Sequence, residues 1–529
     1  MRRRTFVAAS AAALALPSLG RAQSTQLLKF IPQADLSSLD PVWTTATVAR
    51  NHAFLVYDTL YGQTGPQDGY RATPQMVTGH TVSDDGKTWT LMLRDGLLFH
   101  DGGPVRARDC VASIRRWAAR DGFGQTLMAR TDELSATDDR TILFRLKRPF
   151  PLLPNALGKV SANVCAIMPE RIAATDPFKQ ITDAVGSGPY RFRPEERVAG
   201  SRYAYERFQG YRPCETGGTP EWTSGPKVAH FERIEWHIIP DPATAAAALQ
   251  SGEVNGWERA IADLVPSLVR NSRLKRELVY EAGTCESLRL NHVVPPFDKA
   301  AVRRALLSVT SQQDVVTAIT GSDPSLRNLP CGFFPPNSPM ASDAGMDALT
   351  SEPDFDRAKR DLAAGGYNGE RVVLLATADI AELKAASDVV ADAMRRAGVN
   401  VDYQAVDFGT VVQRRTSKKP PAEGGWSAFC SGFGSYDFSN PAIHLLLRGN
   451  GDRAWFGWPT APEIEALRDA WLDAPDLATQ KRLAAEIQVK AFQEVPYIPL
   501  GLFYVYSVYR ADLSGILHGL PLFWNIRRT

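Results

Sequence analysis

Alternating apolar and polar positions predict two β-hairpins in the first third of the chain. In residues 81–93 the side chains of Trp89, Leu91 and Leu93 fall on one face, and Asp85-Gly86 supplies a turn that tolerates positive φ. Residues 132–146 repeat the pattern around a second polar turn. Between the hairpins, apolar residues at helical spacing predict a helix over about 107–120.

The clearest unit lies in residues 371–406. An apolar run at 371–376 predicts a buried strand, and helical spacing follows from 380 to Gly398, where a second alternating stretch begins. Strand, helix and strand joined by short loops predict a right-handed βαβ crossover and therefore a parallel sheet. The expected fold class is α/β with antiparallel additions.

Three further helices are predicted from spacing and capping residues. Apolar residues recur at helical spacing over 302–319, which predicts one long amphipathic helix. Thr460 and Glu463 have the spacing of a capping box before a helix. Asp476 is placed to cap another helix that runs to Glu494.

Residues 1–22 have the pattern of an export signal. Three arginines at positions 2–4 precede an apolar stretch over 6–19, and small residues stand where such signals are cleaved. The stretch is too short to cross a bilayer core of about 30 Å. Paired arginines occur in both twin-arginine and general secretory signals, so the export route stays open. We expect a periplasmic protein from which this signal has been removed.

Composition and charge exclude several other classes of protein. The chain has 529 residues, 22% of them charged, and a formal net charge of only +2 without a basic stripe. Nucleic-acid and membrane-surface binding depend on clustered cations, so neither is expected. The six cysteines form no C-x-x-C pair. One or two disulfides, or buried free thiols, fit them equally well.

Catalytic and metal-binding patterns are missing from the sequence. It contains no H-E-x-x-H, G-x-S-x-G, Walker or G-x-G-x-x-G motif. His230 and His237 are separated by an odd number of residues in a predicted strand, which places them on opposite faces. His100-Asp101-Gly102 fits a turn better than a base with its orienting acid. We therefore expect no catalytic residue, no metal and no cofactor.

Short motifs spread over the chain follow one another in a specific order. They are DDGKTWTL at 84–91, LRDG at 93–96, FHDG at 99–102, GSGPY at 186–190, L-x-SGEV at 249–254, PFD at 296–298 and PYIPL at 496–500. Their order and spacing resemble those of the bacterial extracellular solute-binding proteins of family 5, the peptide/nickel-type substrate-binding proteins of ABC importers. Ser187 stands where the family usually has Thr, and Asn255 replaces its common Asp.

The resemblance implies a two-lobed periplasmic-binding-protein clam-shell of type II with an extra third domain. Its mixed sheets are flanked by helices, and the lobes close over ligand by hinge motion. Lobe I is expected at residues 23–280, with the extra domain at about 60–185, and lobe II at 281–504. The last stretch, 505–529, is expected to return to lobe I.

The resemblance also suggests where a ligand binds. Peptide-binding members hold di- or oligopeptides between the lobes and fix the ligand ammonium with an aspartate four residues before a proline. Asp437 precedes Pro441 with this spacing, although a simple turn fits as well. Other candidate ligand contacts are the aromatic residues near this loop and the lobe I turn: Tyr436, Phe438, Trp426, Trp455, Trp458, Ser187 and Gly188. Core packing of the aromatic residues and a structural turn are the alternatives for them.

Several questions stay open at this level. A ligand carboxylate would pair with a basic residue, and the candidates are Arg414, Arg415, Arg448 and Arg453. The function favoured is peptide delivery, by a monomer, to an inner-membrane permease with ATPase subunits. The same fold binding a non-peptide solute (a metal chelate, an opine or a sugar) is the alternative. A secreted hydrolase is a remote third reading.

Overall fold

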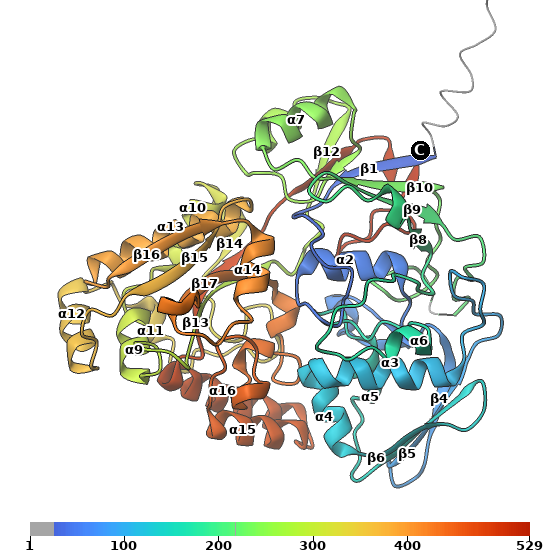
Figure 1. The fold of residues 1–529 in the computed structure, drawn as a ribbon, viewed down its shortest axis with the longest axis horizontal. Coiled ribbons are helices and arrows are strands. Elements are labelled where there is room, and N and C mark those ends of the chain that lie inside the picture. The colour runs from blue at the N-terminus through green and yellow to red at the C-terminus, as the bar shows by residue number, and fades with distance from the viewer. Residues whose placement is uncertain (1–25, 217) are drawn as a thin grey trace, which may run out of the picture.

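The computed structural model describes residues 26–216 and 218–529, so the predicted export signal at 1–22 lies outside the described residues. Two mixed β-sheets form the centres of two lobes, which lie side by side in Figure 1. The chain passes from one sheet to the other at residues 278–283 and returns at 504–506. These two short segments are therefore the places where the lobes can hinge.

The sheet of the first lobe brings together both ends of the described chain. Its strands, in spatial order, are β12 (Leu274–Glu277), β19 (Ser507–Arg510), β11 (Gly256–Trp257), β1 (Leu27–Ile31), β10 (Arg233–His237), β9 (Arg202–Arg207) and β8 (Tyr190–Phe192). β1 runs parallel to β10 and β11, whereas β19 is antiparallel to β11 and β12. Helices of this lobe are α2 (Thr47–Val56), α6 (Glu170–Ala173), α7 (Pro242–Ser251) and α8 (Val265–Leu268).

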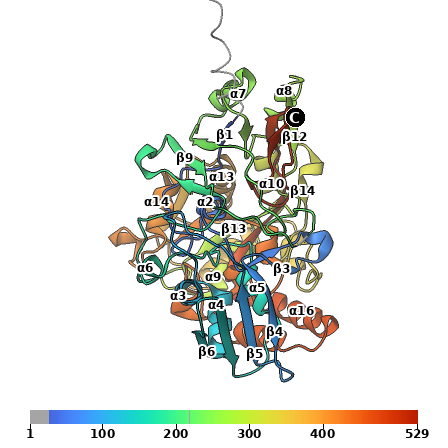
Figure 2. The same cartoon turned by 90° about the vertical axis from the view of Figure 1, so that its right-hand side faces the viewer.

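A separate antiparallel sheet lies at the far end of this lobe, with α3 beside it (Figure 2). Its order is β4 (Val77–Val82), β5 (Thr88–Leu93), β7 (Thr141–Leu146) and β6 (Thr131–Ala136), which confirms both predicted hairpins. Trp89, Leu91 and Leu93 are buried on one face, as their alternation predicted. The predicted helix at 107–120 is α3 (Ala107–Arg120), and α4 (Gly122–Arg130) and α5 (Leu153–Gly158) follow.

The sheet of the second lobe contains the predicted βαβ unit. Its order is β14 (Arg327–Asn328), β18 (Tyr497–Phe503), β13 (Thr284–Leu290), β17 (Ala428–Gly434), β15 (Val372–Thr377) and β16 (Val401–Val406). β15 and β16 are parallel and are joined by α13 (Ala381–Arg396), so the crossover is confirmed. Gly398 ends this helix with a φ of 86°, a conformation that glycine adopts without strain.

The long helix predicted over 302–319 is wrong. The structure has two helices there, α9 (Ala300–Leu307) and α10 (Gln312–Thr320). The side chain of Ser311 accepts a hydrogen bond from the backbone N–H of Asp314 and so begins the second helix. Serine and threonine compete for backbone groups in this way, and the run Ser308 to Ser311 therefore breaks a helix that apolar spacing alone would continue.

One of the two predicted helix caps is also wrong. The helix α15 (Pro462–Leu472) has Ala461 at its N-cap, without a side-chain hydrogen bond. Thr460 instead forms a β-bridge with Asn450, and Glu463 makes an ion pair with Lys490 at 2.6 Å. Asp476 does cap α16 (Leu477–Glu494) by accepting a hydrogen bond from the Thr479 N–H.

The remaining elements are short or peripheral. They are β2 (Tyr61–Gln63), β3 (Ala72–Pro74), α11 (Asp347–Thr350), α12 (Phe355–Ala364), α14 (Phe408–Arg414), β20 (Leu513–Ser514) and β21 (Arg527–Arg528). Within the described chain, no helix combines the length and the apolar character that a membrane span requires. All six cysteines are buried free thiols, and the Sγ atoms of Cys285 and Cys331 lie 3.9 Å apart.

Candidate ligand-binding cleft

Three neighbouring cavities lie where the two lobes face each other. The Asp437 cavity is lined by Asp121, Gly122, Phe123, Lys159, Ser161, Ala162, Phe433, Asp437, Phe438, Ala442, Ile443, His444, Leu445 and Arg448. The Glu286 cavity includes Gln33, Thr45, Arg259, Tyr280, Glu286, Glu382, Arg415, Gly432 and Phe433. The tryptophan cavity, of about 660 Å³, includes Trp43, Thr45, Arg120, Lys418, Arg448, Arg453, Trp455, Phe456 and Trp458. The three cavities adjoin one another and are together called the cleft: Phe433 lines the first two, Thr45 the last two, and Arg448 the first and third.

Asp437 lies in a short 3₁₀ turn, Ser435–Phe438, directly after β17. Its side chain is 7% exposed, and Oδ1 has no hydrogen-bond partner among the described residues. Burial raises the pKa of this carboxyl to about 6, against the opposing effect of the cations Arg50 and Lys159. A buried carboxylate with an unpartnered oxygen and no ion pair is costly, so the site favours a cation that arrives with the ligand.

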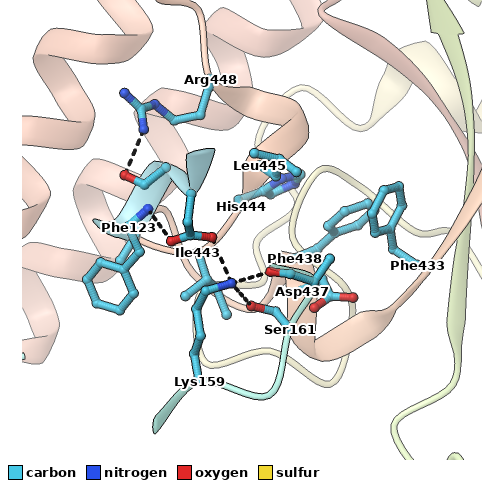
Figure 3. Close-up of a pocket in the computed structure, with 14 residues that line it drawn as sticks. Phe123, Lys159, Ser161, Phe433, Asp437, Phe438, Ile443, His444, Leu445 and Arg448 are labelled. Atoms are coloured by element: carbon cyan, nitrogen blue, oxygen red, sulfur yellow. Dashed lines mark hydrogen bonds and ion pairs between the residues drawn. The ribbon is translucent and has the colours of Figure 1, made fainter. Parts of the chain in front are cut away.

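The nearest lysine is engaged elsewhere, as Figure 3 shows. Lys159 Nζ lies 2.8 Å from Asp121 Oδ2 and donates to Ser161 Oγ at 2.9 Å, and it also donates to the carbonyl of Ala162. Asp121 and Lys159 thus form a buried pair within the first lobe. Asp437 faces the Asp121–Lys159 pair from the second lobe, and among the described residues it forms no ion pair with Lys159.

The two aromatic neighbours of Asp437 hold its turn in place. The Tyr436 hydroxyl accepts a hydrogen bond from Gln63 Nε2 of the first lobe at 2.5 Å. The Phe438 ring stacks on His444 with ring centroids 4.3 Å apart. Phe438 lines the Asp437 cavity, whereas the Tyr436 ring packs against Tyr70. The turn is therefore fixed from both lobes.

The tryptophans predicted as ligand contacts divide into two groups. Trp455 and Trp458 line the tryptophan cavity, and Trp455 Nε1 donates to Thr45 Oγ1 of the other lobe at 3.2 Å. Trp426 is fully buried, donates to the Ser417 carbonyl, and lines none of the three cavities. The structure therefore brings Trp455 and Trp458, but not Trp426, to the cleft.

Ser187 and Gly188 lie on a buried turn beside the end of α2. The Gly188 N–H donates to the Val56 carbonyl, and a Cβ at this position would lie 2.7 Å from the Leu55 carbonyl oxygen. Ser187 Oγ accepts from the Asp58 N–H at 3.3 Å. Neither residue lines the three cavities, and their assignment as ligand contacts stays a prediction.

The four candidate arginines have very different surroundings. Arg414 donates to Gln404 and to backbone carbonyls, Arg448 pairs with Glu465 at 3.0 Å, and Arg453 is exposed beside the tryptophan cavity. Arg415 is buried, and none of the ion pairs in the described chain includes it. The structure thus separates Arg415 from the other three.

Arg415 lines the Glu286 cavity with its guanidinium against two aromatic rings. The guanidinium carbon lies 4.8 Å from the Phe456 ring centroid and 5.3 Å from that of Trp455, and Nη2 donates to Thr45 Oγ1. Burial lowers its pKa to about 9. A fixed guanidinium without a carboxylate partner is suited to bind a ligand carboxylate.

Glu286 is a cleft residue that sequence reasoning missed. It occupies the middle of β13, where every side chain is buried, and burial raises its pKa to about 8. The sequence feature that could have indicated it is a charged residue within the apolar strand that follows residues 278–283, where the chain passes between the lobes. Elsewhere, His100 is buried and accepts a hydrogen bond from the Gly186 N–H, and the described chain contains no group of three metal-ligating side chains.

Two solved structures share the fold over nearly the whole chain. DppA from Helicobacter pylori, in complex with the peptide STSA, superposes with a TM-score of 0.77 at 19% identity, covering 95% of this chain and 98% of that one. AgaA from A. tumefaciens R10, in complex with agropinic acid, gives 0.77 at 20% identity, covering 95% and 99%. These likenesses show the two-lobed periplasmic-binding-protein fold.

Sequence comparison identifies the family as well as the fold. A probable peptide ABC transporter periplasmic-binding protein of Sinorhizobium fredii is 38% identical over 527 residues, which cover 98% of each chain. The family model of the bacterial extracellular solute-binding proteins, family 5, matches residues 71–452. This family consists of solute-binding proteins rather than enzymes. The chain therefore belongs to the bacterial extracellular solute-binding proteins of family 5.

Proposed function

We propose that this protein is the periplasmic substrate-binding component of an ABC importer and binds small peptides between its two lobes. The observation that carries the proposal is Asp437, a buried carboxylate in the cleft with an oxygen that lacks a hydrogen-bond partner among the described residues. The name of the Sinorhizobium relative, a probable peptide ABC transporter periplasmic-binding protein, supports the same ligand class.

The α-ammonium of the peptide would pair with Asp437. Both charges leave water when the lobes close, and their attraction then becomes strong. Leaving one of them buried without its partner costs about 2–5 kcal/mol. That range corresponds to roughly 30-fold to several thousandfold in affinity.

The peptide carboxylate would pair with Arg415 at the other end of the ligand. Its guanidinium is buried and held by two aromatic rings and Thr45. Since the Asp437 and Glu286 cavities share Phe433, an extended peptide could reach both charges. Trp455 and Trp458 would border the side chains of longer ligands in the tryptophan cavity.

The cellular setting follows from the family and the N-terminal sequence. Export by the signal at 1–22 would deliver the protein to the periplasm as a monomer. Each lobe would dock one half of a membrane permease driven by two ATPase subunits. No nucleic acid and no cofactor takes part in this role.

A non-peptide solute is the second candidate. AgaA, which shares the fold at a TM-score of 0.77, has agropinic acid bound. An acid of this kind would offer its carboxylate to Arg415. In a metal chelate the metal takes up the amino and carboxylate groups of its ligand, and a sugar lacks them. A hydrolase would need a nucleophile and base that the sequence motifs do not supply.

Titration calorimetry on the purified mature protein tests the proposal. Free tripeptides should bind, N-acetylated tripeptides should bind at least 30-fold more weakly, and Asp437→Asn should remove most of that difference. Native mass spectrometry of the protein as purified would show a peptide mixture or a single other solute. Equal affinity of Asp437→Asn and wild type for free peptides would overturn the ammonium assignment.

A further inference from the structure

The cleft contains a second buried carboxylate, Glu286, at the centre of β13. Its side chain is 2% exposed, and neither carboxylate oxygen has a hydrogen-bond partner in the described part of the chain. On the neighbouring strand β17 it stands opposite Gly432, where a Cβ would lie 2.9 Å from Glu286 Oε2. The glycine therefore leaves space for the carboxylate at the wall of the Glu286 cavity.

The cations around this cavity are already engaged. Arg259 Nε lies 2.8 Å from Glu382 Oε1, and Arg415 donates to Thr45. Neither arginine forms an ion pair with Glu286 among the described contacts. Charged or titratable groups near Glu286 are Arg259, Glu382, Arg415 and Tyr280 around the cavity and Cys430 on the neighbouring strand; Cys285, next to it in β13, points to the other face of the sheet.

We propose that Glu286 binds a basic side chain of the ligand, an ammonium or a guanidinium, and makes the cleft selective for peptides that contain lysine, arginine or a similar residue. This inference rests on the peptide-binding function proposed above. Asp437 would hold the α-ammonium and Glu286 the side-chain cation of the same peptide. Phe433 lines both cavities.

A structural role explains Glu286 poorly. Buried charges in proteins are normally paired or hydrogen-bonded, because an unpaired one costs several kcal/mol. Glu286 stabilises no helix end and, in the described structure, bridges no pair of strands through its side chain. A carboxylate retained under these conditions is expected where something outside the chain supplies the partner.

Proton exchange gives this site a pH signature. Burial raises the pKa of Glu286 to about 8, and Glu382 adds to the rise, while the Arg259 cation opposes it. Without ligand the carboxyl therefore holds a proton at neutral pH, and a basic side chain would displace that proton. The preference for a cationic over a neutral side chain should rise by up to tenfold for each pH unit from 6 to 8.

The test compares tripeptides that carry lysine or norleucine at the same position. Titration calorimetry at pH 8 should show at least tenfold tighter binding of the lysine peptide for one of the three positions. In Glu286→Gln, which keeps the shape and removes the charge, the ratio should fall below threefold. Glu486→Gln is the control: this carboxylate pairs with Arg482 on the exposed face of α16 and lies outside the cavity, so the ratio should stay at the wild-type value.

The outcomes separate this inference from the proposed function. If wild type binds both peptides equally at every position, the Glu286 inference is wrong and peptide binding stands. If no tripeptide binds, the proposed function fails and this inference fails with it. If Glu286→Gln does not fold, the pH series on the wild-type protein still tests the inference, because it needs no variant. A ratio of lysine-peptide to norleucine-peptide affinity that stays constant between pH 6 and 8 overturns the inference. Titration of Asp437 affects both peptides alike and cancels in that ratio.

Discussion

The guanidinium of Arg259 in the first lobe lies 2.8 Å from the carboxylate of Glu382, at the start of α13 in the second lobe. Both side chains are mostly buried, at 10% and 15% exposure, so the pair is shielded from solvent. It joins the lobes beside the Glu286 cavity. Together with the Gln63–Tyr436 and Thr45–Trp455 hydrogen bonds, it links the two lobes across the cleft.

Because these contacts cross the cleft, ligand-driven closure should depend on them. Small-angle scattering should give a smaller radius of gyration with bound peptide than without. In Glu382→Gln the peptide affinity should fall about 5–30-fold, since a hydrogen bond to a charged group contributes about 1–2 kcal/mol here. Glu486→Gln, which removes an exposed pair with Arg482 on α16, should leave affinity unchanged. An unchanged radius on ligand addition would contradict hinge closure.

Replacing Asp437 by asparagine should stabilise the ligand-free protein while it abolishes tight binding. Burial raises the pKa of Asp437 to about 6, so the folded state disfavours the ionised form at pH 7. At about 1.4 kcal/mol for each pKa unit, the rise from 3.8 to about 6 is worth about 3 kcal/mol. An incompletely bonded amide costs about 1–2 kcal/mol of this, so we expect a gain of about 1–2 kcal/mol.

The stabilisation expected for Asp437→Asn depends on pH in a defined direction. The raised pKa means that the folded protein binds more protons than the unfolded chain between about pH 4 and 6, so the charge penalty is present above pH 6 and vanishes towards pH 4. Thermal midpoints of Asp437→Asn and wild type should therefore differ at pH 7 and converge as the pH falls. A variant less stable than wild type at pH 7 would show that Asp437 is paired inside the protein.

Local patterns in the sequence predicted the parts of the fold that local physics decides. The βαβ unit, whose helix ends at Gly398, and the Asp476 cap depend on residues within one element and its turn. The prediction of one helix over 302–319 was wrong because the apolar spacing continues in phase through Ser311. The Ser311 side chain caps the start of a second helix, and the first helix ends before it. Periodicity indicates which face of an element is buried, but it does not indicate where a side chain forms a hydrogen bond with the backbone and interrupts a helix.

The site divides in the same way. Asp437 was predicted because its spacing to Pro441, a local feature, matches that of the peptide-binding members which the sequence resembles. Arg415 could not be chosen over Arg414, its neighbour in sequence, because their difference lies in contacts with Thr45 and Phe456, far away along the chain. Glu286 carries no motif, and only its burial without a partner identifies it.

Peptide affinity should fall in acid through the titration of Asp437. In the ligand-free protein its pKa is about 6, and only the ionised form pairs with an ammonium. Below pH 6 the affinity should therefore drop by about tenfold for each pH unit, and above pH 7 the Asp437 contribution should be constant. Calorimetric titrations of a neutral-side-chain peptide from pH 4.5 to 7.5 measure this slope. In Asp437→Asn the slope should disappear, and a persistent slope there would assign the titration to another group.

Arg415 should discriminate between free and amidated peptide C-termini. Its guanidinium lines the Glu286 cavity, is held by Thr45 and two aromatic rings, and makes no ion pair among the described residues. A ligand carboxylate that pairs with it loses about 2–5 kcal/mol when the arginine is removed, because the carboxylate is then buried alone. Arg415→Met, which keeps much of the apolar stem, should therefore weaken free peptides at least 30-fold in calorimetry and affect C-terminally amidated peptides much less. Arg414→Met is the matched control, since Arg414 donates to Gln404 and the Gly425 carbonyl instead of lining the cleft cavities, and its affinity should match wild type. If Arg415→Met lowered the affinity for free and amidated peptides equally, the guanidinium would bind the ligand backbone or stabilise the closed lobes instead of binding the carboxylate.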